Sequence, residues 1–373
     1  MSTPMIIFLV IATGYLVGAI KVKGFNLGSS GVLIMALIFG HFGYQIPDEI
    51  QQIGLVCFVA SIGLIAGADF FRSISIKSLN YILIGFITIL VGAAVCVATI
   101  VFFDVQTPLA IGIMTGALTS TPGLAAAVEA TGDSIASIGY GIAYPFGVIG
   151  VVIFVQIMPR LIGAKAGSLD GAEDVDVEFS KNHEIRANLI NIDKHGFFVL
   201  ALAIITGILI GSIAIPLPGG GSFSLGNSGG PLLSGLIISH FGHIGKINIR
   251  AGKNTLELMR ELGMILFLTG AGLNAGNGFV EILVENGVSL LFFGALITAI
   301  PMFVSYFIGR KLLKMDLMKS LGSICGGMTS TPALGTMLNV SDDGDSVTGA
   351  YAMTYPIALV CVILSCQIIA LFF

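Results

Sequence analysis

Two copies of one short polar stretch decide the fold of this chain: "LTSTPGLAAA" at residues 118–127 and "MTSTPALGTM" at residues 328–337. Each copy interrupts a long apolar segment with the tetrapeptide Thr-Ser-Thr-Pro. The whole chain is 55% hydrophobic and only 10% charged, with a mean hydropathy of +0.99. Soluble domains carry about 25% charged residues. The sequence therefore predicts an all-α polytopic membrane protein in a lipid bilayer, and it contains no basic run that would indicate nucleic-acid binding.

The two stretches belong to an internal duplication that covers most of the chain. "FNLGSSG" from residue 25 matches "FSLGNSG" from residue 223, and "GLVCFVASIGLIAGADF" from residue 54 matches "GMILFLTGAGLNAGNGF" from residue 263. Gly-Asp-Ser follows each tetrapeptide, and a Tyr-Pro pair stands in the segment after it. We divide the chain into membrane repeat one (1–160), a polar linker (161–195) and membrane repeat two (196–373).

Each repeat contains six apolar segments, and a membrane-spanning helix takes about 20 apolar residues. In repeat one they lie at 5–20, 31–43, 52–68, 79–103, 108–128 and 136–159. In repeat two they lie at 197–215, 229–242, 262–277, 287–308, 320–338 and 347–371. The second segment of each repeat is short, and we keep it as a span because the distribution of charges requires it.

Positive residues favour the cytoplasmic side of a membrane, and they indicate the topology. If segments one to four and six cross, and segment five enters and leaves on the same side, all 17 Lys and Arg lie in the cytoplasm. A crossing fifth segment would divide them between the two sides. Five crossings per repeat is an odd number, so the repeats insert with opposite orientation. The N- and C-termini are then outside and the linker is cytoplasmic, in a design typical of secondary transporters.

The tetrapeptide predicts the tip of a re-entrant hairpin. Pro122 suits the first turn of a new helix, and Ser120 or Thr121 suits its N-cap. Thr331 and Pro332 repeat the pattern from the opposite face. Two half-helices would then direct their N-termini, with free N–H groups and the positive dipole end, toward the membrane centre, where a carboxylate is a suitable ligand. A tight turn with a packing role is the alternative interpretation.

Further candidate positions lie in the third and sixth segments. A proline inside a helix removes the hydrogen bond to the carbonyl four residues earlier, so Pro145 and Pro356 could free carbonyls to hold an ion, or they could only kink the helix. Small residues in segment three predict close helix crossing, with Ser61 and Asn274 as polar exceptions. The candidate substrate-binding residues are Thr119, Ser120, Thr121, Pro122, Gly123, Thr329, Ser330, Thr331, Pro332, Ala333, Ser61, Asn274, Tyr144 and Tyr355, and the candidate ion-coordinating residues are Gly141 and Ala352.

Other chemistry finds little support in the sequence. The five cysteines have no metal-site spacing, and no nucleotide-binding or hydrolase motif is present, so we expect no metal, no cofactor and no enzymatic activity. Glu129 is the acidic residue close to a tetrapeptide, but the matched position holds Asn339, which argues against a catalytic dyad. Hydroxyl and carbonyl oxygens could bind a coupling cation, Na⁺ or H⁺, but no residue demands one.

The doubled Ser-Thr-Pro motif, with Gly-Asp and Tyr-Pro after each copy, resembles the aspartate–alanine exchanger family of bacterial membrane transporters. The resemblance implies a secondary transporter of small carboxylates, such as aspartate, alanine, glutamate or succinate, in the bacterial inner membrane. Many members of the family carry regulatory domains in the central loop, where this chain has only a short acidic linker. Other carboxylate transporters with paired hairpins work as dimeric elevators, so by analogy we expect a homodimer with scaffold and transport domains.

Two other classes of protein remain as alternatives. An ion channel with re-entrant pore loops would need a ring of carbonyls or charges on an oligomer axis, whereas inverted halves favour a single central site. An intramembrane enzyme would need a buried acid–base pair, which the asymmetry between Glu129 and Asn339 does not provide.

Overall fold

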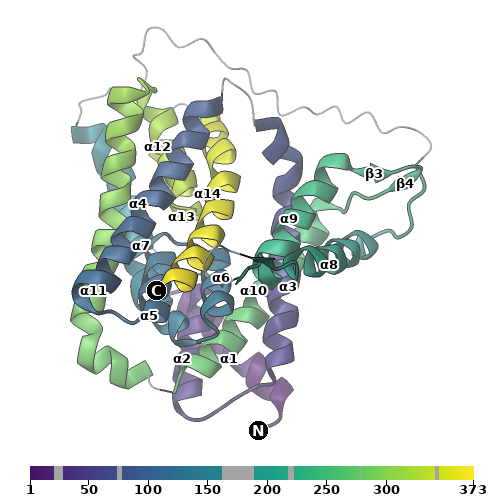
Figure 1. Cartoon of the computed structure of the whole chain (residues 1–373), viewed down its shortest axis with the longest axis horizontal. Helices are drawn as coiled ribbons and strands as arrows, with labels where there is room; N and C mark the ends of the chain where they lie inside the picture. The colour runs from purple at the N-terminus through teal and green to yellow at the C-terminus, as the bar shows by residue number, and fades with distance from the viewer. Residues whose placement is uncertain (21–27, 74–77, 162–188, 217–221, 278, 341–343) are drawn as a thin grey trace.

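A computed structural model describes residues 1–20, 28–73, 78–161, 189–216, 222–277, 279–340 and 344–373, and it is almost entirely helical (Figure 1). The elements of repeat one are α1 (Thr3–Gly18), α2 (Ser30–His41), α3 (Asp48–Ser73), α4 (Leu79–Phe103), α5 (Thr107–Ala117), α6 (Thr121–Thr131) and α7 (Ile135–Leu161). Those of repeat two are α8 (Phe197–Gly211), β1 (Ile215–Pro216), β2 (Ser222–Phe223), α9 (Gly226–Phe241), β3 (His243–Ile244), β4 (Ile247–Asn248), α10 (Lys253–Ala275), α11 (Phe279–Phe307), the π-helical turn η2 (Ile308–Leu312), α12 (Leu317–Gly327), α13 (Thr331–Val340) and α14 (Gly344–Phe372).

Membrane crossing is supported by the lengths of the helices. Among the described helices, α3, α4, α7, α11 and α14 contain windows that are long and apolar enough to span a bilayer. The apolar helices α1, α2 and α8 are shorter. The chain is thus a polytopic membrane protein, while the number of crossings and the sidedness of the termini stay predictions. Most of the linker, residues 162–188, lies outside the described residues.

The fifth segment of each repeat is broken at the tetrapeptide, as the sequence predicts. In repeat one the break separates α5 from α6, each of 11 residues, and in repeat two it separates α12 from α13. Two antiparallel strand pairs, β1–β2 and β3–β4, were not predicted. They contain only two residues per strand and flank α9.

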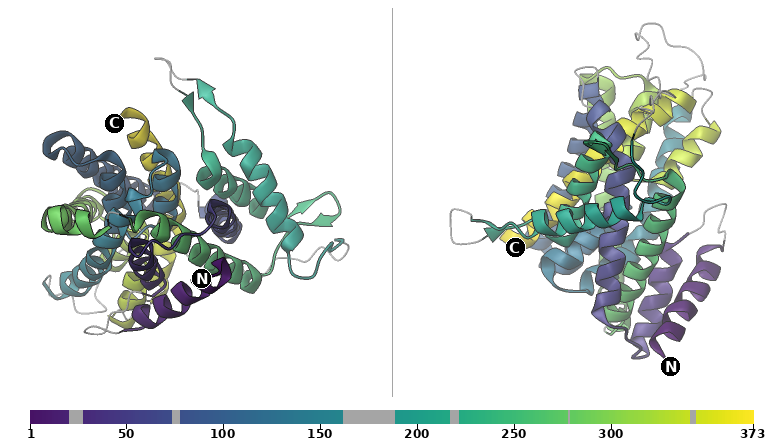
Figure 2. Two further views of the ribbon diagram at one scale, coloured as in Figure 1. Left: turned by 90° about the horizontal axis from the view of Figure 1, so that it is seen from below. Right: turned by 90° about the vertical axis from the view of Figure 1, so that its right-hand side faces the viewer.

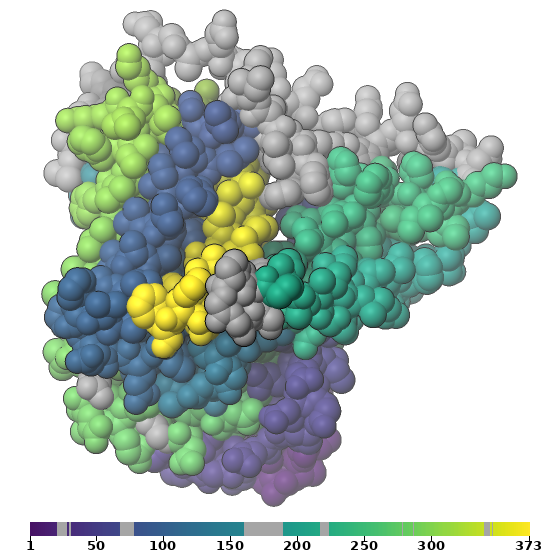
Figure 3. All heavy atoms as spheres, viewed as in Figure 1, coloured from purple at the N-terminus to yellow at the C-terminus, as the bar shows by residue number. Residues whose placement is uncertain are grey.

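The helices pack as two groups, each drawn from both repeats (Figure 2). The hairpin group contains α4–α7 and α11–α14, and its strongest contacts join α5 to α7, α12 to α14, α4 to α14 and α7 to α11. The crossing group contains α1–α3 and α8–α10, and its strongest contacts join α3 to α9 and α10. The outer face of the hairpin group in Figure 3 shows α4 (blue) beside α14 (yellow). Contacts between the groups are much sparser than those within them.

Glycines allow the close crossings in the crossing group, which confirms the expectation from the small residues of segment three. Gly54 of α3 and Gly263 of α10 face each other where these helices meet. A Cβ on Gly54 would lie 2.6 Å from the Phe267 nitrogen, and one on Gly263 would lie 2.5 Å from the Phe58 nitrogen. Backbone atoms cannot move aside as a flexible side chain can, so both positions require glycine.

Candidate functional site at the two hairpin tips

Each hairpin tip is a tight turn held by its own backbone. In the first tip the N–H groups of Leu118, Thr119 and Ser120 donate back to carbonyls in the last turn of α5, at distances of 2.8–2.9 Å. Thr119 has a left-handed backbone with φ of 56°, which is rare for a β-branched residue. Such strain persists only where the surrounding structure enforces it, and it concentrates at functional sites.

The second tip repeats this geometry. The N–H groups of Met328, Thr329 and Ser330 donate to carbonyls of α12 at 2.8–3.0 Å, and Thr329 has φ of 49°. The same unusual conformation therefore occurs at matched positions of the two repeats. One strained threonine could be incidental, whereas two at matched positions indicate a shared requirement.

Ser120 and Ser330 cap the returning half-helices. The Ser120 Oγ accepts a hydrogen bond from the Gly123 N–H at 3.1 Å, and the Ser330 Oγ accepts one from the Ala333 N–H at 3.4 Å. Both serines are fully buried. The predicted choice of N-cap between Ser120 and Thr121 is thus resolved in favour of Ser120, because Thr121 is already the first residue of α6.

The two tips are joined by reciprocal hydrogen bonds. The Thr119 Oγ1 donates to the Met328 carbonyl at 2.7 Å, and the Thr329 Oγ1 donates to the Leu118 carbonyl at 3.0 Å. Both threonine side chains are buried. The chain thus brings residues 118–123 and 328–333, about 210 positions apart in sequence, to one buried contact.

A tyrosine hydroxyl supports each half-helix from the neighbouring long helix. The Tyr140 hydroxyl is 2.9 Å from the Thr121 Oγ1, and the Tyr351 hydroxyl is 3.4 Å from the Thr331 Oγ1. Tyr144 and Tyr355, the residues chosen from the sequence, stack behind them with ring centroids 5.2 and 5.3 Å apart. Sequence reasoning missed the role of Tyr140 and Tyr351, although both are matched in the duplication and stand four residues before the chosen tyrosines.

One positive side chain that sequence reasoning left out interacts electrostatically with the two tyrosines of α14. Arg260 of α10 is exposed, and its guanidinium interacts electrostatically with Tyr351 and Tyr355. The matched position of repeat one, three residues before Gly54, is the neutral Gln51. The two matched positions therefore differ in charge.

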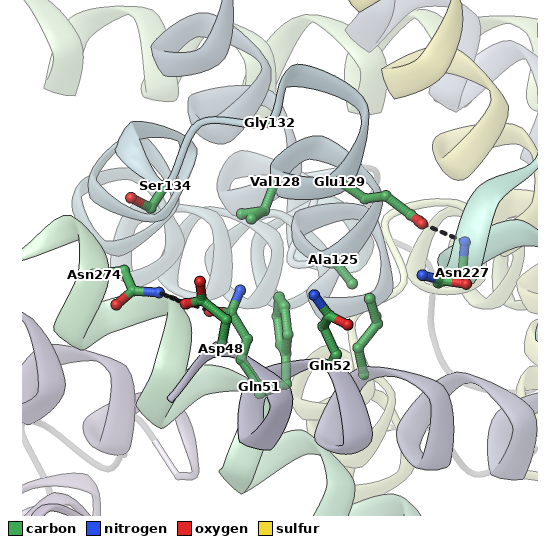
Figure 4. Close-up of a pocket in the computed structure, with 12 residues that line it drawn as sticks. Asp48, Gln51, Gln52, Ala125, Val128, Glu129, Gly132, Ser134, Asn227 and Asn274 are labelled. Carbon is green, nitrogen blue, oxygen red and sulfur yellow. Dashed lines mark hydrogen bonds between the residues drawn. The ribbon is translucent and has the colours of Figure 1, made fainter. Parts of the chain in front are cut away.

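A polar cavity of about 290 Å³ lies beside α6, between the two helix groups (Figure 4). Its polar lining includes Asp48, Gln51, Gln52, Glu129, Ser134, Asn227 and Asn274. Asn274 donates to the Asp48 carboxylate at 3.0 Å and to the Gln51 amide oxygen at 3.1 Å. Asn274 was chosen from the sequence together with the tip residues, but it lines this cavity and the tip residues do not.

The remaining sequence candidates have clear positions but no demonstrated role. Ser61 is fully buried in α3, and its hydroxyl has no partner within the described part of the chain. The helices α7 and α14 continue through Pro145 and Pro356, so the proposed release of the Gly141 and Ala352 carbonyls stays a prediction. Asp133, in the Gly-Asp-Ser stretch after the first tip, accepts a hydrogen bond through its Oδ1 from the N–H of Ile135, the first residue of α7, at 2.9 Å. The side chain of Asp345 lies outside the described residues.

Comparison with known proteins identifies the family. A family model described as "Predicted Permease Membrane Region" of the aspartate–alanine exchangers matches residues 6–160 and 199–371, which together include both hairpins. The chain belongs to this family. It is similar, at 30% identity, to an uncharacterized transporter of Bacteroides fragilis, with 98% of this chain and 97% of the relative covered. A transporter of Bacteroides thetaiotaomicron is 29% identical with the same coverage. One of Desulfotalea psychrophila is 27% identical, with 96% of this chain and 95% of the relative covered.

The matched transporter of Bacteroides fragilis is longer than this chain. The alignment with the Bacteroides fragilis transporter runs over 520 positions, whereas this chain has 373 residues, so the relative contains a large insertion. The family model leaves 161–198 unmatched, which includes the whole linker. The chain is thus a membrane transporter.

Proposed function

We propose that this transporter is a secondary active exchanger or exporter of small carboxylates, such as aspartate, alanine, glutamate or succinate. It would work by alternating access around the two Thr-Ser-Thr-Pro tips. The main support is the reciprocal pair of hydrogen bonds between Thr119 and Thr329 and the opposite tip. This contact brings two capped half-helix N-termini to one buried place, where N–H groups and helix dipoles favour an anion.

The serines give this site its hydrogen-bond donors. In the described contacts, Ser120 and Ser330 use their oxygen atoms as acceptors for their own helices. A hydroxyl has one O–H donor besides its acceptor lone pairs, so each serine keeps a proton to donate to a bound carboxylate. Arg260, which interacts electrostatically with Tyr351, adds a positive charge to the surroundings of the second tip. These groups together form an anion clamp that needs no charged residue at the tips themselves.

The sparse contacts between the two helix groups support movement of one group relative to the other. Both hairpins belong to the hairpin group, so this group would carry the substrate while the crossing group forms the scaffold of an elevator-type homodimer. In this proposal the protein lies in the bacterial inner membrane, with the linker in the cytoplasm and both termini outside. An ion channel is less well supported, because the tips close on each other inside one chain rather than around an oligomer axis.

The direct test is transport by purified protein in liposomes. Vesicles loaded with unlabelled dicarboxylate are offered labelled aspartate, alanine, glutamate or succinate, and we expect uptake of at least one of them to depend on internal substrate. Absence of uptake across a broad carboxylate panel would contradict the proposal. Single-channel currents in planar bilayers would favour the channel instead.

The serine clamp predicts that substitution of either serine weakens substrate binding while the folded protein remains in the membrane. Ser120→Ala and Ser330→Ala each remove one charge-assisted donor, which is worth about 1.5–3 kcal/mol, so we expect substrate affinity to fall by about tenfold or more. Asp316→Ala is a matched control, because Asp316 caps α12 by accepting from the Met318 N–H at 2.8 Å. It removes a cap worth about 1 kcal/mol but should leave affinity unchanged. Unchanged affinity in both serine variants would place the site elsewhere.

Arg260 predicts a second effect on affinity that depends on substrate charge. We expect Arg260→Gln, which copies the matched Gln51, to weaken binding of dicarboxylates by about tenfold and of a zwitterion such as alanine by less. Lys253→Gln is the control, because Lys253 lies on the same helix and is exposed, with Glu257 3.9 Å away. Equal effects of the two substitutions on competition binding would remove Arg260 from the site.

A further inference from the structure

The end of α6 and the beginning of α9 are joined by an unusual contact. The two carboxylate oxygens of Glu129 each accept one backbone hydrogen bond, from the Asn227 N–H and, at 2.6 Å, from the Ser228 N–H. The N-cap residue of α9, Leu225, provides no side-chain cap. Glu129 therefore caps a helix from the other repeat, and the contact joins the hairpin group to the crossing group.

The local backbone is shaped for this carboxylate. Gly226, the first residue of α9, has a left-handed φ of 63°, and a Cβ there would lie 2.7 Å from the Glu129 Cδ. A side chain at this position would therefore displace the carboxylate. The approach of Glu129 to α9 depends on a glycine, which indicates a built contact rather than a chance proximity of surface groups.

A second, independent observation is an unpaired acceptor beside this carboxylate. Gln367 of α14 is 8% exposed and donates through Nε2 to the Leu225 carbonyl at 2.7 Å. Its Oε1 is buried and has no partner among the described residues. Gln367 and Glu129 line one cavity of about 270 Å³, and both contact the single turn 225–228. A buried acceptor requires a donor, and a protonated carboxyl group supplies one O–H.

We propose that Glu129 is a proton-binding site that couples proton binding to movement of the hairpin group. In its charged form Glu129 holds α6 against the N-terminus of α9. After protonation it releases the α9 amides and donates its O–H to the Gln367 Oε1. The inference rests on the proposed transport function, in which the hairpin group moves past the crossing group.

The energetic reason is the cost of an uncompensated charge. Moving the hairpin group away from α9 while Glu129 is ionised would strip the carboxylate of two hydrogen-bond donors and of the helix dipole. A neutral carboxyl group carries no such penalty, so proton binding permits the movement. The matched position of repeat two is Asn339, which does not titrate, so each chain has one such site.

Few charged side chains of the described residues surround Glu129. Across the polar cavity lies Asp48 of α3 (Figure 4). Asp133 precedes α7, where it accepts from the Ile135 N–H. In the described parts of α5, α14 and the first turns of α9, no charged side chain occurs beside Glu129. From α10 the cavity is lined by Phe267 and Asn274, which are neutral.

The first test measures proton binding without any transport. Hydrogen–deuterium exchange of the peptide containing Asn227 and Ser228 is measured in wild type and in Glu129→Gln. The ratio of the two exchange rates is taken at each pH, so that the intrinsic exchange rates cancel. Near pH ~8 we expect exchange to be slower in wild type by about tenfold, because two charge-assisted bonds protect these amides. The ratio should fall toward one as the pH is lowered and Glu129 takes up its proton. A ratio that does not change with pH overturns the proposal.

Two further variants keep this test decisive if Glu129→Gln folds poorly. Gly226→Ala displaces the carboxylate without removing it and should abolish the protection. Gln367→Met removes the hydrogen-bond acceptor of the Glu129 O–H. The pH at which the α9 amides lose their protection should then move to lower values. Gln156→Met, at the matched position in repeat one, is the control and should leave that pH unchanged. Identical behaviour of Gln367→Met and Gln156→Met would also overturn the proposal.

The second test measures coupling in liposomes that contain a pH-sensitive dye. We expect substrate-dependent proton movement in wild type, and substrate exchange without proton movement in Glu129→Gln. Equal proton movement in both proteins would contradict coupling through Glu129. If wild type transports no carboxylate at all, the proposed substrate class fails. The hydrogen–deuterium exchange measurement still decides whether Glu129 binds a proton.

Discussion

Replacement of both Thr119 and Thr329 by valine is expected to slow carboxylate exchange by at least about tenfold. Valine has nearly the shape of threonine but cannot donate a hydrogen bond. The double variant therefore removes both bonds between the tips, at 2.7 and 3.0 Å, and leaves the Met328 and Leu118 carbonyls without these donors in a buried place. An unsatisfied buried group costs about 1–3 kcal/mol, and about 1.4 kcal/mol changes an equilibrium tenfold.

The expected loss of transport follows from what the contact does in the cycle. If the tips meet in one conformation and separate in another, weakening the contact shifts the population away from the closed conformation by the same factor. The double variant keeps the backbone strain at both tips, because valine is β-branched like threonine. The effect therefore reports on the hydrogen bonds rather than on the left-handed conformation.

A double-mutant cycle separates this effect from general destabilisation. The two bonds close one contact, so the single variants should be coupled by about 0.5–3 kcal/mol, measured from exchange rates and from substrate affinity. Thr115→Val is the matched control, because the Thr115 hydroxyl is equally buried but bonds to the Gly112 carbonyl of its own helix at 3.0 Å. Purely additive effects, or an equal loss in Thr115→Val, would show that the contact between the tips is not part of the mechanism.

The sequence predicted the broken fifth segments because their signals are local. A proline after a hydroxyl residue, within an apolar run, is enough to indicate a helix start. The same holds for α4, predicted at 79–103 and found at Leu79–Phe103, whose apolar run is bounded by polar residues. Close crossing at Gly54 and Gly263 was also readable, since small residues at regular spacing have few other uses in a membrane helix.

The different hydrogen-bond partners of the three tip hydroxyls could not be predicted from the sequence. Thr119, Ser120 and Thr121 are consecutive, yet one bonds to the opposite tip, one caps its own helix and one contacts Tyr140. The choice depends on the left-handed φ of Thr119, which is a tertiary constraint and not a local preference of threonine.

Long-range partners were missed for the same reason. Tyr140 and Tyr144 lie four residues apart on one helix face, and only the packing of α6 against α7 decides which hydroxyl reaches Thr121. The contact between Glu129 and α9 joins positions about 100 residues apart. In the sequence Arg260 counts as one more positive residue at a cytoplasmic helix end, and its electrostatic interaction with Tyr351 of α14 depends on the tertiary arrangement.

Gly112→Ala is expected to cause the largest loss of stability among single-methyl additions in the hairpins. A Cβ on Gly112 would overlap the Ala136 carbonyl oxygen and lie 2.7 Å from its carbon, where α5 crosses α7. The obstacle is backbone, so relief requires the two helices to separate. Overpacking of this kind costs about 1–3 kcal/mol and occasionally more, and it would act directly on the first hairpin.

The control for this substitution is provided by the same pair of hairpins. Gly335 lies in α13 with no atom within 4 Å of a built Cβ. Gly335→Ala should therefore be neutral or stabilising by about 0.5–1 kcal/mol, because alanine favours helix over glycine. A thiol-reactive dye can follow thermal unfolding, since Cys96, Cys325 and Cys366 are free and buried in the folded protein.

The matched glycine of repeat two turns this comparison into an ordered series. A Cβ on Gly322 would lie 2.6 Å from the Val347 carbonyl oxygen but 3.1 Å from the Val347 Cα, a less severe overlap than at Gly112. The unfolding temperatures should therefore rise in the order Gly112→Ala, Gly322→Ala, Gly335→Ala. Equal temperatures for the first and last would mean that α5 and α7 can separate at little cost. The first hairpin would then not be rigidly mounted on α7, and an anion clamp that depends on two fixed tips would lose its mechanical basis.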